Sequence, residues 1–391
     1  MKTNITSILL SISLLLGLRV QAGPTLKQAF KQDFLIGAAL NPSQFCGSNA
    51  VEATLVKQQF NSISPENVLK WEEVHPKPGK YDFRLADRYV EFGEKNGMFI
   101  IGHNLVWHAQ TPVWVFENAN GQPVSRKVLL QRMRDHIMTV VGRYQGRIKG
   151  WDVVNEALAE DGSLDTNSPW MRIIGPDYIE KAFEFAREAD PKAELYYNDF
   201  SMENPAKRAG GLALVRRLKA EGIPIIGVGL QGHYTLNWPS DRELNKTIDA
   251  FAKLGVKVMI TELDVDVLPA AWEQGNADIS RNFQLQKQLN PYSNGLPAEM
   301  QQRLADRYAD LFQVFLKHRD VISRVTLWGV ADQDSWLNDW PVQGRTSYPL
   351  LFDRQYQPKP AFEAVIKTAQ AKAITVSAVE ASGLQTENAA R

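Results

Sequence analysis

The segment IKGWDVVNEA, residues 148–157, changes from apolar to polar at a position where a buried strand would still be apolar. Trp151 and Val153 are residues that favour β-strands, whereas Asn155 and Glu156 follow them directly. The segment therefore predicts a buried strand with a carboxylate at its outer end.

A second segment of the same design follows about a hundred residues later. KVMITEL, residues 257–263, is short, rich in β-forming residues and places Glu262 near its end. Two carboxylates at strand ends are typical of glycosidic bond cleavage, in which one protonates the leaving oxygen and the other attacks or activates water. Either glutamate alone could simply begin a solvated loop, but the pair favours the catalytic interpretation.

Composition limits the partners and the size of the protein. With 391 residues, 44% of them hydrophobic, the chain can form one large domain or two modest ones. Its 44 basic and 44 acidic residues balance, so no charge excess favours nucleic acid or an anionic membrane as a partner. Ten tryptophans suit the flat faces of sugar rings, although tryptophan is also ordinary core material.

The N-terminus is typical of a secretory signal peptide, residues 1–22. Lys2 precedes an apolar run at 8–18, which is too short for a membrane anchor. The single cysteine, Cys46, excludes an intrachain disulfide. We therefore expect a protein secreted to the periplasm or the medium, with a core large enough to do without disulfides.

Beyond the leader, apolar β-rich runs alternate with segments of helical period. The predicted strands are Phe34–Leu40, Ser62–Glu66, Met98–Val106, Ile148–Asn155, Glu194–Asn198, Ile225–Leu230, Val256–Thr261 and Val325–Val330. The predicted helices between them are Val128–Tyr144, Tyr178–Asp190, Pro205–Glu221, Arg242–Leu254 and Gln301–His318. This alternation predicts an α/β fold, a (β/α)₈ TIM barrel in a single catalytic domain over 23–370. Residues 371–391 are small and polar and are expected to be a disordered tail.

Seven of the eight predicted strands finish in groups of polar and aromatic residues, which lie in the last part of the strand or directly after it. They are Glu66, Asn67, Lys70 and Trp71; His103, Asn104, Trp107, His108 and Gln110; Asn155 and Glu156; Tyr197, Asn198 and Asp199; Gln231 and His233; Glu262 and Asp264; and Trp328 and Asp332. In such barrels the loops at the carboxyl ends of the strands build the active site. Two long loops, at 269–297 and 332–349, carry further aromatic residues to that end.

In their order along the chain, these motifs resemble glycoside hydrolase family 10, the endo-β-1,4-xylanases. The motifs are SPENVLKWE, GHNLVWH, WDVVNEA, YNDF, GLQGH, ITELD and LWGVADQDSW, and they span nearly all of the chain after the leader. Asn104 stands where the family usually has threonine, and the loop after Pro269 is longer than in the shorter family members.

The resemblance implies a retaining hydrolase of xylan, with Glu156 as acid/base and Glu262 as nucleophile. In retaining enzymes the two carboxyl groups lie about 5 to 5.5 Å apart, so that the nucleophile attacks the sugar directly. Asn155 would bond the 2-hydroxyl of the reacting sugar, a contact that strengthens in the transition state. By the same resemblance we expect a monomer without cofactor or metal.

The remaining site residues are also assigned by resemblance. His233 would orient Glu262, and Asp264 would hold His233, although both could simply be polar groups satisfied beneath a loop. The expected substrate-binding set has Lys70 and His103 at the cleavage point, Glu66 and Asn67 one sugar further toward the non-reducing end, Trp328 and Trp336 as walls, and Trp107, Tyr197, Gln231 and His233 around them.

Three other interpretations stay open. A metal hydrolase could use His103, His108 and His233, but the sequence has no HExxH motif, and Lys70 would oppose a cation. A carbohydrate-binding protein could use the tryptophans without catalysis, although it would gain little from two buried acids. A β-1,4-glucanase could use the same scaffold, and the sequence cannot show whether the cleft has room for the hydroxymethyl group of glucose.

Overall fold

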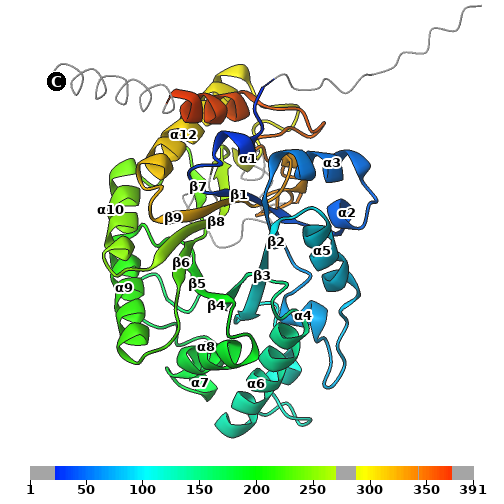
Figure 1. Ribbon diagram of the computed structural model, residues 1–391, viewed down its shortest axis with the longest axis vertical. Coiled ribbons are helices and arrows are strands. Elements are labelled where there is room, and N and C mark those ends of the chain that lie inside the picture. Colours follow the sequence, from blue (N-terminus) through cyan, green and yellow to red (C-terminus); the bar gives the residue numbers. More distant parts are fainter. Residues whose placement is uncertain (1–22, 270–287, 342, 372–391) are drawn as a thin grey trace, which may run out of the picture.

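Eight parallel strands close into a barrel in the computed structural model of the chain, which describes residues 23–269, 288–341 and 343–371 (Figure 1). The barrel strands are β1 (Leu35–Leu40), β2 (Ser62–Pro65), β3 (Phe99–Val106), β4 (Gly150–Asn155), β5 (Glu194–Asp199), β6 (Gly227–Leu230), β8 (Lys257–Asp266) and β9 (Ile322–Leu327). Each pairs with the next, β9 returns to β1, and β6 pairs directly with β8. The predicted (β/α)₈ barrel is confirmed.

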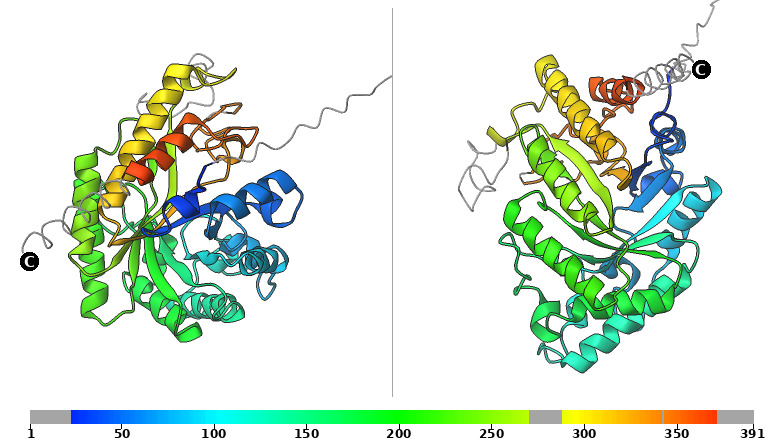
Figure 2. Two further views of the ribbon diagram at one scale, coloured as in Figure 1. Left: turned by 45° about the horizontal axis from the view of Figure 1, so that its top comes forward. Right: turned by 60° about the vertical axis from the view of Figure 1, so that its left-hand side comes forward.

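Helices surround the barrel on its outside (Figures 1 and 2). The five predicted ones are α6 (Arg126–Arg143), α8 (Tyr178–Ala189), α9 (Pro205–Ala220), α10 (Asp241–Ala252) and α12 (Ala298–Lys317). The others are α1 (Leu26–Ala29), α2 (Pro42–Phe45), α3 (Ala50–Gln59), α4 (Trp71–Val74), α5 (Arg84–Lys95), α7 (Pro169–Ile173), the 3₁₀ turns η1 (Val113–Val115) and η4 (Asp332–Asp334), and a last helix over 360–371.

Side-chain caps help to define where several of these helices begin. The Ser125 hydroxyl accepts a hydrogen bond from the Val128 N–H at the start of α6, and Ser240 does the same for the Glu243 N–H at the start of α10. Such caps satisfy one of the amide groups that a helix start leaves unpaired.

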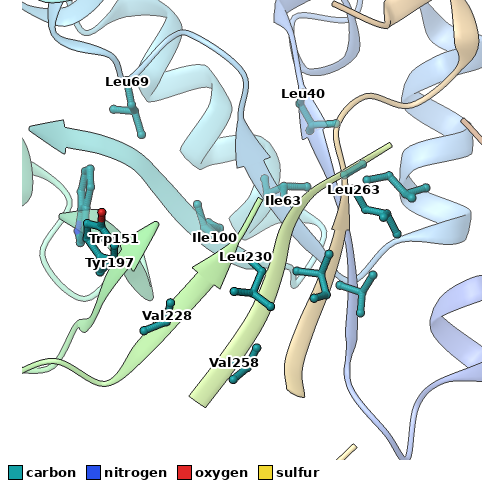
Figure 3. Packing of buried hydrophobic residues seen from close by; sticks show 14 of the residues in the cluster. Leu40, Ile63, Leu69, Ile100, Trp151, Tyr197, Val228, Leu230, Val258 and Leu263 are labelled. Atoms are coloured by element: carbon teal, nitrogen blue, oxygen red, sulfur yellow. The ribbon is translucent and has the colours of Figure 1, made fainter. Parts of the chain in front are cut away.

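The core has a large cluster and a small separate one. Leu40, Ile63, Ile100, Val228 and Val258 belong to the large cluster, which joins the strands to the helices (Figure 3). The small cluster consists of Ile101, Tyr196 and Met259. A Cβ atom on Gly150 of β4 would lie 2.5 Å from the Tyr196 ring, so this position requires glycine.

Two strands differ from their predicted bounds by three residues or more, because charged residues lie inside them, whereas the other six differ by only one or two residues. Arg324 belongs to β9, where it is buried, contacts the Tyr196 ring and donates to Thr326. The prediction began this strand only at Val325, after the arginine. β8 continues past the predicted Thr261 to Asp266, since its second half pairs with the short strand β7 (His233–Thr235). The alternating carboxylates in this half look like a strand end in sequence.

Some predicted features lie outside the described residues. These are the signal peptide at 1–22, residues 270–287 of the long loop and residues 372–391 of the tail. Among the described helices, none combines the length and the apolar character that crossing a membrane requires.

Candidate active site

A cleft of about 880 Å³ lies at the carboxyl ends of the barrel strands. It is lined by Glu66, Asn67, Lys70, His103, Trp107, Gln110, Asn155, Glu156, Glu160, Phe200, Ser201, Asn204, Gln231, His233, Thr235, Trp238, Glu262, Trp328, Trp336 and Trp340. The fold thus brings together residues that are up to 274 positions apart, and among them are all the predicted site residues except Tyr197 and Asp264.

Glu156 follows the last residue of β4, and three side chains donate hydrogen bonds to its carboxylate. Trp107 Nε1 donates to Oε2 at 2.8 Å, while Gln231 Nε2 at 2.8 Å and Asn155 Nδ2 at 3.1 Å donate to Oε1. The donors come from three different strands or strand ends. The carboxylate therefore has a defined orientation in the cleft while remaining partly exposed.

One amide connects the surroundings of the two carboxylates. The side-chain nitrogen of Asn198, on β5, donates to Asn155 Oδ1 at 2.8 Å and to Glu262 Oε1 at 2.7 Å. Its oxygen accepts a hydrogen bond from Thr261 at 2.6 Å. A Cβ atom on Gly229 would lie 2.2 Å from that oxygen, so glycine on β6 makes room for the amide.

Glu262 lies within β8 and is only 5% exposed. His233 Nε2 lies 3.2 Å from Glu262 Oε2, and His233 Nδ1 lies 3.1 Å from Asp264 Oδ2. Trp336 Nε1 donates to the same Asp264 oxygen at 2.8 Å. The histidine is therefore placed to donate to a carboxylate from each ring nitrogen.

This arrangement changes the pKa of both members of the His233–Glu262 pair. Burial lowers the pKa of His233, but Asp264 and Glu262 outweigh it and raise the pKa to about 10. Burial alone would raise the pKa of Glu262, but the hydrogen bond from His233, the charge of His103 and the amide of Asn198 bring it below its ordinary value. Glu262 is thus ionised at neutral pH, and His233 is an imidazolium.

The cleft also contains a buried cation, Lys70. Lys70 Nζ donates to Gln110 Oε1 at 2.6 Å and to Asn67 Oδ1 at 2.9 Å, and it lies 5.1 Å from the centre of the Trp107 ring. Burial lowers the pKa of Lys70, and the nearby Glu262 and Glu66 oppose that change. Burial likewise raises the pKa of Glu66, with Lys70 opposing it.

His103 contacts a buried carboxylate, Asp152, through its Nδ1 atom. Its Nδ1 lies 2.9 Å from Asp152 Oδ2 of β4, and both side chains are 3% exposed. The ring of Trp328 packs edge-on against His103 with 5.4 Å between the centroids. His103 lines the cleft, and Asn104 Nδ2 lies 3.4 Å from its other ring nitrogen, Nε2.

Tyr197 was predicted to bind substrate, and this prediction is wrong. The residue is fully buried and is absent from the cleft lining. Successive strand residues point to opposite sides of a sheet, so the Asn198 side chain points toward Asn155 and Glu262 while Tyr197 points away from them. Its hydroxyl group donates to Asp199 and accepts the Ala157 N–H at 3.1 Å.

Several cleft residues come from loops and were not predicted. Glu160 lies in the loop after β4, Phe200 and Asn204 lie in the loop after β5, and Trp238 and Trp340 lie in loops after β7 and η4. The Trp340 ring packs against the Trp336 ring, tilted by 34°, with 5.0 Å between ring centroids. The two tryptophans in polar loops could have been found by the reasoning that selected Trp336.

The site can therefore supply a buried ionised carboxylate and a second, partly exposed one, with aromatic walls and hydroxyl-binding groups around them. This set can cleave a glycosidic bond. Within the described ranges, no group of three or more His, Cys, Asp or Glu is arranged to hold a metal ion.

Comparisons with known proteins all indicate the same protein family. The sequence model of Glycosyl hydrolase family 10 matches residues 25–368. The chain is 47% identical over 347 residues to endo-1,4-beta-xylanase A of Xylanibacter ruminicola, covering 89% of this chain and 94% of that protein. It is 43% identical over 344 residues to an endo-1,4-beta-xylanase of Geobacillus stearothermophilus, covering 88% and 98%. A solved GH10 endoxylanase from a sugarcane soil metagenome has a TM-score of 0.83 and 46% identity, covering 89% of this chain and all of that one.

Proposed function

Since the chain belongs to glycosyl hydrolase family 10, we propose that it cleaves internal β-1,4-xylosidic bonds of xylan by double displacement through a covalent glycosyl-enzyme. The observation that carries the proposal is the different environment of two carboxylates in one cleft. Glu262 is buried and ionised, whereas Glu156 is partly exposed and reachable by a leaving group or water.

In the first step, Glu262 attacks the anomeric carbon. The carboxylate is positioned for attack because Asn198 and His233 each hold one of its oxygens. Glu156 gives its proton to the departing glycosidic oxygen, so the leaving sugar departs as a neutral alcohol.

In the second step, Glu156 takes a proton from water, which attacks the anomeric carbon and releases Glu262. The product then has the configuration of the substrate, since two inversions have occurred. Asn155 lies between the two carboxylates in the hydrogen-bond network, where it can bond the 2-hydroxyl of the reacting sugar.

The remaining groups of the cleft support a sugar substrate. Lys70 and His103 can bond hydroxyl groups at the cleavage point, and Glu66 and Asn67 can bond those of the next sugar. The ring faces of Trp328 and Trp336 can cover the sugar at the cleavage point. The relatives named above are xylanases, which supports xylan as the polymer.

Export and a monomeric state are part of the same proposal. Their support is the leader pattern at 1–22, which lies outside the described residues, and the complete set of site residues within one chain.

The test is the release of reducing ends from soluble xylan and from carboxymethylcellulose. We expect rapid release from xylan, early products of mixed length and retained activity in excess chelator. Glu262→Ala should fold but lose nearly all activity. A wild-type protein that binds xylan without cleaving it would refute the proposal, faster cleavage of the cellulose derivative would favour a β-1,4-glucanase, and loss of activity in chelator would favour a metal hydrolase.

A further inference from the structure

A buried network outside the cleft holds the segment that carries Glu156. We propose that Tyr197, fixed by the buried ion pair between Asp199 and Lys207, is a positioning residue for the acid/base step. The inference rests on the proposed role of Glu156 and concerns residues that do not touch the substrate.

The backbone of Glu156 requires support. Its φ angle is +55°, in the left-handed region that non-glycine residues seldom adopt. Residues in such conformations persist when their surroundings hold them, and they concentrate at functional sites. Two successive amides supply this support, since the Glu156 N–H donates to the Asn198 carbonyl at 2.9 Å and the Ala157 N–H donates to Tyr197 Oη at 3.1 Å.

The Tyr197 hydroxyl group is itself fixed in direction. It donates its single hydrogen to Asp199 Oδ2, so the lone pairs of its oxygen are left to accept the Ala157 N–H. Asp199 Oδ1 accepts the Phe200 N–H at 2.9 Å and lies 3.0 Å from Lys207 Nζ on α9. Burial raises the pKa of Asp199 to about 7, and the charge of Lys207 opposes this rise. In its ionised form the Asp199 carboxylate strengthens the hydrogen bond that orients the phenol.

The network is protected from water along its whole length. Tyr197, Asp199 and Lys207 are each 0% exposed. Lys207 Nζ also lies 3.3 Å from the centre of the Phe200 ring, which lines the cleft. One buried ion pair thus supports both the turn at Glu156 and the adjoining wall of the cleft.

A second tyrosine provides a matched control. Tyr234 is also buried and donates to a buried carboxylate, at 2.6 Å to Glu203 Oε1. Its described hydrogen bonds do not reach Glu156 or Ala157. Removing either hydroxyl group therefore costs one tyrosine–carboxylate bond, but only Tyr197→Phe removes the acceptor from the turn at Glu156.

The test compares kcat/KM for two aryl β-xylobiosides, which reports the first step. Dinitrophenolate departs without a proton, whereas phenolate requires one from Glu156. We expect Tyr197→Phe to lose about tenfold to hundredfold on the phenyl substrate, the scale of a small displacement of a catalytic group. On the dinitrophenyl substrate the loss should be less than about threefold, as in a variant with intact nucleophile and binding groups. Tyr234→Phe should change both substrates equally and little.

Parallel measurements separate the possible failures. Equal losses on both substrates, or no loss on either, would overturn the inference for Tyr197. Glu156→Ala must discriminate between the substrates even more strongly, and if it does not, the proposed role of Glu156 fails instead. Should Tyr197→Phe be unfolded at the assay temperature, Asp199→Asn decides. This variant keeps an oxygen acceptor for the phenol but removes the charge of the carboxylate. It should therefore also lose more kcat/KM on the phenyl substrate than on the dinitrophenyl substrate, but the loss should be smaller than that of Tyr197→Phe.

Discussion

Replacing His233 by asparagine should shift the pH dependence of the first step. His233 donates to Glu262 from Nε2 and contacts Asp264 through Nδ1. Burial acts to raise the pKa of Glu262, and the His233 hydrogen bond is the largest influence that lowers it. Without the imidazolium, burial is still opposed by the charges of His103 and Lys70 and by the amide of Asn198, but the largest opposing influence is gone, so the pKa of Glu262 should rise.

The size of the effect follows from the type of hydrogen bond. A hydrogen bond to a charged group contributes about 1.5 to 3 kcal/mol. At about 1.36 kcal/mol for each pKa unit, losing it moves the acid limb of kcat/KM upward by about 1 to 2 pH units. At a pH above the acid limbs of both the wild type and the variant, kcat/KM of the variant should still be about tenfold or more below that of the wild type. The reason is that the carboxylate loses one of its two orienting donors.

The assay is the pH profile of kcat/KM on dinitrophenyl β-xylobioside. This leaving group needs no proton, so the acid limb reports the nucleophile. His318→Asn is the matched control, since His318 is also largely buried and lies 3.6 Å from an aspartate, Asp249, but is not in the cleft lining. An unmoved acid limb together with lost activity would refute the reasoning and would make His233 only a sugar-binding residue.

Three further predictions concern specificity and stability. Trp336→Ala should raise the ratio of activity on aryl cellobiosides to aryl xylobiosides by roughly tenfold to two-hundredfold, because it opens room for the hydroxymethyl group; an unchanged ratio would contradict this. Lys359→Met should lower the free energy of unfolding, measured in urea, by about 3 to 5 kcal/mol, since Asp332 lies 2.9 Å from Lys359 Nζ and would be left as an unpaired buried charge. The free energy of unfolding should also fall as the pH rises from 6.5 through about 10, because the raised pKa of His233 stabilises the fold only while the ring is protonated. His233→Asn should remove this part of the slope.

The barrel was predictable because its strands and most of its long helices have clear hydrophobic periods. The segment 148–157 is the clearest case, with β4 ending at Asn155 as predicted. The predictions missed α3 and α5. They also placed β9 too far along the chain, because a buried arginine cannot be distinguished in sequence from one in a loop. Arg324 donates to Thr326 on its own strand and contacts the Tyr196 ring of β5, and the sequence does not show this contact between two strands.

The cleft was predictable where its residues stand at strand ends. Glu66, His103, Asn155 and Gln231 all line it. Tyr197 stands at a strand end too, but its side chain points away from the cleft, to Asp199 and the Ala157 N–H. The sequence does not show which side of the sheet a residue takes where β4 and β5 have an irregular register. Trp238 and Phe200 belong to loops, whose paths depend on contacts between distant segments.

The covalent intermediate tests the central claim most directly. The protein should be incubated with dinitrophenyl 2-deoxy-2-fluoro-β-xylobioside, digested and analysed by mass spectrometry. The fluorine slows both steps, and the activated leaving group keeps the first step fast enough for the intermediate to accumulate. We predict that one peptide gains the mass of the fluoroxylobiosyl group and that fragmentation places it on Glu262. A label on any other residue, or an active protein that releases dinitrophenolate with no label at all, would contradict the account.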